Sequence, residues 1–188
     1  MTRLHSLGKD GDVIKKILVN TLTLIRIPLT ILFIILFINN SVTLELLVLF
    51  LILLTDFIDG KLSRKLNASS KFGGILDVYC DLFFVLCTSI LFNVYNLVNI
   101  AYTIILVFKF IEFNITSYYA GASKNNIPFV FDKIGKTVTT LYQTVPFVVI
   151  LPVVSKYSCL YIVCLMTGTI ISSILRIFSL VTLKKVID

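Results

Sequence analysis

Charged residues are scarce in this sequence, and tryptophan is absent. Asp, Glu, Lys and Arg make up 14% of the 188 residues, whereas hydrophobic residues make up 57%. Soluble globular domains carry about 25% charged residues, so this chain lacks the polar surface of a water-soluble enzyme. A disordered tail is excluded for a different reason, because such segments are poor in apolar residues.

Histidine and paired cysteines are also lacking. The single histidine, His5, lies in the N-terminal tail, and the four cysteines form no C-x-x-C motif. We therefore expect neither a zinc site nor a disulfide framework. We interpret the cysteines as small apolar packing residues.

Long apolar runs are what the sequence does contain. A membrane-spanning helix needs about 20 mostly apolar residues. Such segments lie at residues 18–38, 41–59, 72–93, 97–119, 134–154 and 157–182. The predicted fold is all-α: a polytopic membrane protein with six transmembrane helices, forming a single domain over residues 1–188.

The placement of Lys and Arg predicts the orientation in the membrane. Thirteen of these residues lie on the side of the two termini, and one, Lys156, lies on the opposite side. Basic connections stay in the cytoplasm, so we expect both termini to face the cytoplasm. We expect the protein itself to lie in the plasma membrane. The net charge of +7 then reflects topology and attraction to anionic headgroups, and we expect no nucleic-acid partner.

Residues 1–17 are polar and basic and precede the first predicted span. Apolar residues flank Lys15 and Lys16, a pattern typical of a short interfacial helix in the headgroup layer. Alternatively, the segment only prevents translocation, and the sequence leaves both interpretations open.

The acidic residues are concentrated in one region. Four of the ten lie between positions 56 and 81. Asp56 and Asp59 are at the end of the second predicted span, and Asp77 and Asp81 are at the start of the third. Spacings of three and four residues put each pair on one helix face. Because a cytoplasmic loop joins these antiparallel helices, we expect the pairs to face each other near the membrane surface.

This arrangement predicts a metal centre. A carboxylate inside a span costs about 2.5–3.5 kcal/mol on insertion scales, and clustered carboxylates repel one another. Oxygen ligands without histidine or thiolate point to Mg²⁺ or Mn²⁺, and four carboxylates can hold two ions about 3.5–4 Å apart. An ordinary turn or helix start could explain Asp59. It would not explain Asp77 and Asp81, which lie within an apolar segment.

The same residues carry a resemblance to a known family. Two segments separated by eight residues resemble the signature D-x-x-D-G-x-x-A-R, gap, G-x-x-x-D-x-x-x-D of the CDP-alcohol phosphatidyltransferases. They read Asp56-Phe-Ile-Asp59-Gly60-Lys-Leu-Ser63-Arg64 and Gly73-Gly-Ile-Leu-Asp77-Val-Tyr-Cys-Asp81. Seven fixed positions match, and Ser63 replaces the usual alanine with another small residue.

The resemblance implies an activity. A CDP-linked lipid, CDP-diacylglycerol, would give its phosphatidyl group to a small alcohol and release CMP, in an enzyme that forms a homodimer. The residues expected to hold two divalent ions are Asp56, Asp59, Asp77 and Asp81. Asp81 would also act as general base on the acceptor hydroxyl.

The resemblance also implies residues that bind the CDP-lipid. Gly60 and Gly73 would let the nucleotide approach the helices closely, and Arg64 would bind phosphate or anchor in the headgroup layer. Asn20, Thr23 and Arg26 resemble an N-x-x-T-x-x-R stretch of the family's first span, although Val19 replaces the usual preceding proline. Their polar groups suit phosphate oxygens, and the alternative role is polar contact between helices.

Weaker resemblances concern the acceptor. Gly135-Lys136-Thr-Val-Thr139 is similar to the G-K-x-K-T stretch of phosphatidylglycerophosphate synthases, with Val138 replacing the second lysine. Lys109 lies where these enzymes tend to have arginine, although it could instead pair with Glu112. Glycerol 3-phosphate is favoured, and inositol phosphate and serine remain open. The residues interpreted as acceptor-binding are Arg26, Lys109, Lys133, Lys136, Thr139 and Arg176.

Two other classes also use carboxylates within a membrane. An intramembrane prenyltransferase needs two separate Asp-rich motifs and more spans than 188 residues allow. A small cation transporter would distribute acidic residues along a path through the bilayer. Here only Glu45 lies near the far end of the second predicted span.

Overall fold

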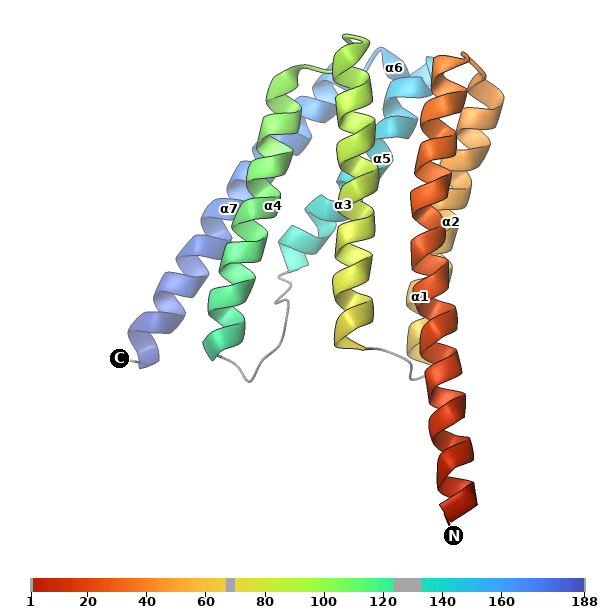
Figure 1. The fold of residues 1–188 in the computed structure, drawn as a ribbon. Coiled ribbons are helices and arrows are strands. Elements are labelled where there is room, and N and C mark those ends of the chain that lie inside the picture. The colour runs from red at the N-terminus through yellow and green to blue at the C-terminus, as the bar shows by residue number, and fades with distance from the viewer. Residues whose placement is uncertain (1, 67–69, 124–132, 188) are drawn as a thin grey trace. The chain divides into compact units, whose positions relative to one another are not determined.

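The computed structural model describes residues 2–66, 70–123 and 133–187, and all regular elements in these ranges are helices. In chain order these are α1 (Thr2–Ile38), α2 (Val42–Lys65), α3 (Lys71–Val94), α4 (Ile100–Ser123), α5 (Lys133–Ile150), α6 (Pro152–Ser155) and α7 (Ser158–Ile187) (Figure 1). The predicted all-α class is confirmed for these ranges.

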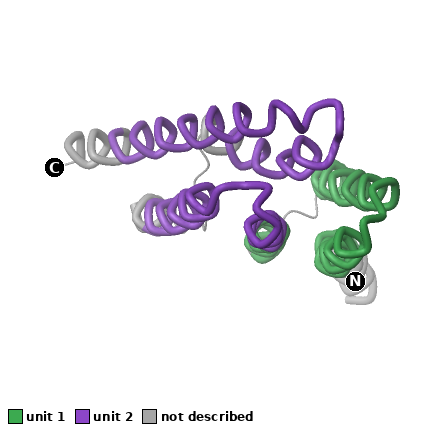
Figure 2. Tube along the Cα trace, turned by 90° about the horizontal axis from the view of Figure 1, so that it is seen from above, with its two compact units in different colours: residues 1–84 green, residues 85–188 purple. Residues whose placement is uncertain are grey.

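The chain divides into two compact units, Met1–Phe84 and Val85–Asp188, with the boundary inside α3 (Figure 2). The first unit contains α1, α2 and the first part of α3, and α1 packs along α2. In the second unit α7 contacts both α4 and α5. Each unit is described by itself below.

Within the described ranges, four helices are long and apolar enough to cross a membrane, at Lys15–Ile38, Phe72–Val94, Ile100–Tyr118 and Ser158–Phe178. They identify an integral membrane protein. They correspond to four of the six predicted spans, and the spans at 41–59 and 134–154 remain predictions. The helix α2 is not among these four helices. It is 24 residues long, but it carries three carboxylates, Glu45, Asp56 and Asp59, which lower its apolar character.

Two helix boundaries differ from the sequence prediction. The predicted fifth span, 134–154, is interrupted, because α5 ends at Ile150 and α6 begins at Pro152. Leu151 has an extended conformation, with φ −68° and ψ 116°, as expected for a residue before proline. In addition, residues 2–17 form no separate helix, since α1 continues through them to Ile38.

The helix ends explain two tight connections. Asn40 after α1 and Asn96 after α3 have positive φ values of 54° and 55°, a conformation that asparagine tolerates well. After α1, the Asn40 amide donates to the Phe37 carbonyl and the Ser41 amide donates to the Leu36 carbonyl. This pattern ends the helix and satisfies its last carbonyl groups.

Polar side chains join the helices of the second unit. The Tyr142 hydroxyl lies 2.9 Å from the Thr169 hydroxyl, and the Tyr161 hydroxyl lies 2.6 Å from the Thr144 hydroxyl. These contacts link α5 to α7. Hydrogen bonds of this kind help helices to associate where lipid surrounds them and apolar contact gives little driving force.

Candidate metal centre and substrate-binding residues

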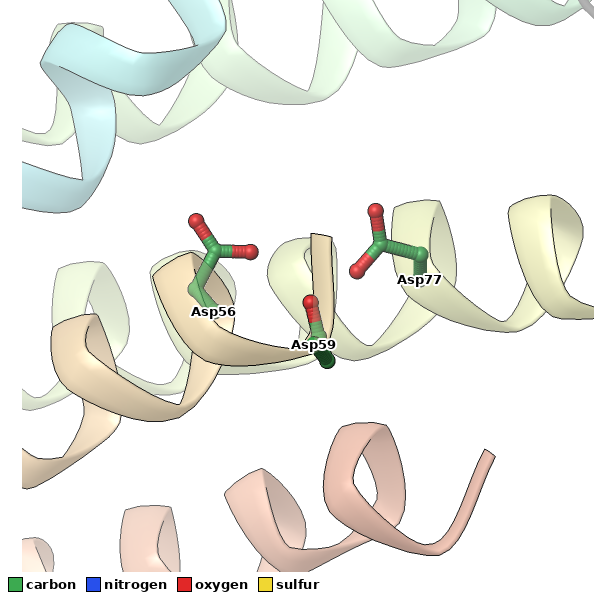
Figure 3. A group of neighbouring side chains, drawn as sticks. All are labelled: Asp56, Asp59 and Asp77. Atoms are coloured by element: carbon green, nitrogen blue, oxygen red, sulfur yellow. The ribbon is translucent and has the colours of Figure 1, made fainter. Parts of the chain in front are cut away.

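Three carboxylates from two helices converge in the first unit. Asp56 and Asp59 come from the last turns of α2, and Asp77 comes from the second turn of α3. One oxygen of each lies within 4.8 Å of the others (Figure 3). Asp59 is buried, and the other two are partly exposed. The predicted meeting of the two helix ends at one acidic site is confirmed.

The composition of this group is compatible with a divalent metal ion. Its ligand atoms are carboxylate oxygens only, and Mg²⁺ and Mn²⁺ prefer such ligands over nitrogen or sulfur. The partial exposure of Asp56 and Asp77 leaves part of the group accessible. The residues therefore fit a hard cation.

Asp81 is placed differently from the other three. It lies one turn further along α3 than Asp77, and the three-carboxylate group does not include it. It is connected to that group through Arg26, which pairs with all four aspartates. The fourth predicted ligand thus adjoins the three-carboxylate group.

Arg26 on α1 lies inside the acidic site. Its side chain is 1% exposed, and its Nη2 lies 2.5 Å from Asp59 Oδ2 and 2.6 Å from Asp77 Oδ1. Its Nη1 lies 3.2 Å from Asp56 Oδ1 and also pairs with Asp81. The sequence grouped Arg26 with the acceptor-binding residues, whereas its observed contacts are with the expected metal ligands.

Two further residues of α1 share this helix face with Arg26. Thr23 is buried, and its hydroxyl lies 3.1 Å from Asp59 Oδ2 and 3.2 Å from the Val19 carbonyl oxygen. Asn20 approaches the start of α3, since a Cβ added at Gly73 would lie 3.0 Å from Asn20 Oδ1. The N-x-x-T-x-x-R spacing therefore brings Thr23 and Arg26 to the acidic site and Asn20 to the start of α3.

The start of α3 is fixed by a residue that the sequence analysis did not single out. The Gly73 amide donates to Ser70 Oγ at 2.9 Å, and the Gly74 amide donates to the Ser70 carbonyl. Ser70 is thus the N-cap of the helix that carries Asp77 and Asp81. A serine three residues before Gly73, at the start of an apolar run, was the signal that could have identified it.

The remaining motif residues differ in what surrounds them. A Cβ added at Gly60 would meet no atom within 4 Å, so this position faces open space. The side chain of Arg64 lies outside the described part of the structure.

A second polar cluster lies in the other unit, between α4 and α7. The Lys109 ammonium donates to Glu112 Oε2 at 2.8 Å and to the hydroxyls of Ser172 and Ser173 at 3.2 Å. The sequence left the Lys109–Glu112 pair open, and the structure contains it. All four residues are buried.

Arg176 belongs to the same cluster. Its Nε donates to Thr116 Oγ1 at 2.7 Å, and its Nη2 donates to Ser117 Oγ at 2.9 Å. Its Nε also lies 3.7 Å from Glu112 Oε1, so one carboxylate lies between two cations. Glu112 was missed as a shared partner because its link to Arg176 spans 64 residues of sequence.

The other predicted acceptor residues are on α5. The side chains of Lys133 and Lys136 lie outside the described residues. Thr139 is described and exposed.

Comparison with known proteins gives one family match. Residues 16–175 match the CDP-alcohol phosphatidyltransferase family. The matched range includes the aspartates of the candidate metal centre and, from the second cluster, Lys109 and Glu112, and it ends one residue before Arg176. No curated protein matches the chain. Because the match covers most of the 188 residues, the chain belongs to the CDP-alcohol phosphatidyltransferase family and is a membrane enzyme of lipid biosynthesis that transfers a substituted phosphate group from a CDP-linked alcohol to a second alcohol.

Proposed function

We propose that this enzyme transfers the phosphatidyl group of CDP-diacylglycerol to glycerol 3-phosphate and releases CMP. The observation that carries the proposal is the convergence of Asp56, Asp59 and Asp77 from α2 and α3 within 4.8 Å. These residues belong to the motif that resembles the family signature. The family match supports the reaction class, and the acceptor is argued separately below.

Asp56, Asp59 and Asp77 are the proposed metal ligands, with Asp81 completing the site. Two divalent ions, Mg²⁺ or Mn²⁺, would supply the positive charge that neutralises the diphosphate and stabilises the departing CMP. Thr23 orients the Asp59 carboxylate through its hydrogen bond.

Asp81 is the proposed general base. Its carboxylate accepts the proton of the acceptor hydroxyl as the hydroxyl oxygen forms its bond to the phosphatidyl phosphorus and the bond to CMP breaks. Its position beside the three-carboxylate group, and not within it, supports a role distinct from that of Asp56, Asp59 and Asp77.

The proposed CDP-lipid contacts are made by both arms of the motif. Gly60 faces open space, which supports close approach of the nucleotide to α2. The other residues proposed to bind this substrate are Asn20, Thr23, Arg64 and Gly73.

The charge of the second cluster supports an anionic acceptor. Lys109 and Arg176 carry two positive charges and Glu112 carries one negative charge, so the buried cluster has an excess positive charge. Such an excess favours a phosphorylated alcohol over serine, which has no net charge. Lys133, Lys136 and Thr139 on α5 are proposed to contribute, and inositol phosphate is the alternative phosphorylated acceptor.

One assay tests this proposal. Purified protein is incubated with CDP-diacylglycerol, Mg²⁺ and one acceptor at a time, and both CMP and the lipid product are measured. We expect CMP to be released when glycerol 3-phosphate is the acceptor, and we expect this release to stop in excess EDTA. Turnover with serine but not with glycerol 3-phosphate would overturn the proposed acceptor. Full turnover in EDTA would overturn the metal assignment. A prenyltransferase or cation transporter would release no CMP.

We also propose that residues 1–188 act as one domain in the plasma membrane, as a homodimer with six spans and cytoplasmic termini. The supporting observation is the excess of basic residues on one side of the predicted spans. Single cysteines at positions 40 and 124 test the topology with a membrane-impermeant thiol reagent, in a chain whose native cysteines are replaced. We expect labelling from outside at position 40 only.

A further inference from the structure

The centre of the acidic site contains a positively charged side chain of the protein itself. The two terminal nitrogens of Arg26 pair with carboxylate oxygens of Asp56, Asp59, Asp77 and Asp81. Three of these carboxylates are the ones that form the candidate metal centre. The guanidinium therefore interacts with the groups that a divalent ion needs.

These two kinds of cation compete for the same carboxylates. Nη2 of Arg26 contacts Asp59 and Asp77 together, at 2.5 and 2.6 Å. An ion bound by these carboxylates would have to lie beside that nitrogen, where the positive charges of the ion and the guanidinium repel each other. The ion would also need the carboxylate lone pairs that are directed at the guanidinium. We therefore expect that full metal ligation and the present contacts of Arg26 exclude each other.

Arg26 partly neutralises the aspartate cluster while no metal is bound. Four clustered carboxylates next to apolar helices repel one another, and a single guanidinium removes one of the four negative charges. Its planar fork can contact several carboxylates at once. An arginine at this position thus holds α1 to α2 and α3 through ion pairs that connect three helices.

One donor of Arg26 is not satisfied by these contacts. Its Nε is buried and has no hydrogen-bond partner among the described residues. A buried N–H without an acceptor is costly, and the side chain that carries it is 1% exposed. A phosphate oxygen is a strong acceptor for a guanidinium, so this donor indicates a second set of contacts for Arg26.

We infer that Arg26 is the resident counter-ion of the aspartate cluster, which leaves the carboxylates when divalent ions bind and then contacts the diphosphate of the CDP-linked substrate. The inference rests on the metal binding proposed above. It assigns to Arg26 a positioning role at the metal centre in place of the acceptor contact expected from the sequence.

Metal affinity tests the inference without reference to turnover. Mn²⁺ binding to the full chain in detergent is measured by electron paramagnetic resonance, with no lipid substrate present, for wild type and Arg26→Gln. A neighbouring charge shifts proton binding to a carboxylate by about 10- to 1,000-fold, so we expect Arg26→Gln to bind Mn²⁺ at least about tenfold more tightly. Equal or weaker binding by the variant overturns the inference, even when wild type binds Mn²⁺ as proposed.

Two further variants complete the measurement. Arg176→Gln is the matched control, because it removes a buried arginine of the second unit whose contacts include Glu112, Thr116 and Ser117, and it should retain wild-type Mn²⁺ affinity. Arg26→Lys keeps the positive charge but lacks the planar fork, and should show an affinity between those of wild type and Arg26→Gln. If Arg26→Gln does not fold, the Mn²⁺ affinity of Arg26→Lys is compared with that of wild type instead. Absence of Mn²⁺ binding in wild type and in both Arg26 variants overturns both this inference and the proposed metal centre.

The wild-type protein provides a measurement that needs no variant. Phenylglyoxal modifies accessible arginines, and peptide mass spectrometry distinguishes the four arginines of the chain. We expect little modification of Arg26 without metal, more with Mn²⁺, and protection again when CDP-diacylglycerol is added with Mn²⁺. Modification of Arg26 that does not change with Mn²⁺ overturns the inference.

Discussion

Gly73 at the start of α3 lies against Asn20 of α1, so closely that a Cβ at position 73 would be 3.0 Å from Asn20 Oδ1. The same Cβ would also lie 3.0 Å from Ser70 Oγ, the N-cap of the helix. Gly60 of the same motif has open space at the corresponding position. The two glycines therefore have different roles in the structure, although both are fixed positions of one signature.

This difference predicts opposite effects of alanine. Gly73→Ala should destabilise the protein by about 1–3 kcal/mol, because the new methyl group displaces Asn20 or Ser70. Gly60→Ala should keep the wild-type free energy of unfolding or raise it by up to about 1 kcal/mol, because alanine favours a helix interior more than glycine does, and it should reduce affinity for the CDP-lipid. Denaturant unfolding in detergent and CDP-lipid binding are the measurements. Equal destabilisation by both substitutions would contradict the assigned roles.

Thr23 provides a test of how α1 orients the metal ligands. Thr23→Val keeps the shape of the side chain but removes the hydroxyl that bonds to Asp59 Oδ2. Hydrogen bonds to charged groups contribute about 1.5–3 kcal/mol, so we expect weaker Mn²⁺ binding and a turnover lowered by roughly tenfold. Thr23→Ser retains the hydroxyl and should stay near wild type. A Thr23→Val protein with unchanged Mn²⁺ affinity would show that Asp59 needs no such support.

Asp81 and Asp56 should lose activity in different ways. If Asp81 is the general base, Asp81→Asn lowers kcat by about 10²–10⁴-fold while affinity for Mn²⁺ and CDP-lipid is largely kept. Asp56→Asn removes a metal ligand, so it should weaken metal binding and lower turnover by well over tenfold. The measurements are kcat and the affinities for Mn²⁺ and CDP-lipid, made on the two variants side by side. An equal loss of Mn²⁺ affinity would assign Asp81 to coordination.

The Lys109–Glu112–Arg176 cluster predicts a stability effect in the second unit. Lys109→Met removes one partner of a buried ion pair and the ammonium that donates to the Ser172 and Ser173 hydroxyls. Breaking such a pair costs about 3–5 kcal/mol, so we expect a clearly lowered unfolding midpoint. Ser172→Ala removes one hydrogen bond of the ammonium and should cost about 1 kcal/mol. A Lys109→Met protein as stable as wild type would favour a substrate contact over a structural pair.

Much of this architecture is readable from the sequence because its causes are local. Apolar runs such as 72–93 exceed the length that a bilayer requires, and α3 covers that run. The spacings of Asp56 to Asp59 and of Asn20, Thr23 and Arg26 each define a single helix face, so their members lie together in the structure. Pro152 is recognisable in the sequence as a possible helix end, and the predicted span 134–154 nevertheless ran through it, since the use of one proline within an apolar run depends on its surroundings.

The contacts between helices depended on tertiary structure. The sequence by itself determined the helical class, the membrane environment, the family signature and the pairing of acidic residues within each helix, because these follow from hydropathy and helical periodicity. It could not determine that Arg26 would lie among the aspartates, that Gly73 would touch Asn20, or that Glu112 would lie between Lys109 and Arg176. These relationships join residues up to 55 positions apart in the first unit and up to 64 positions apart in the second. Such contacts are set by how helices rotate and pack against one another, which no single helix encodes.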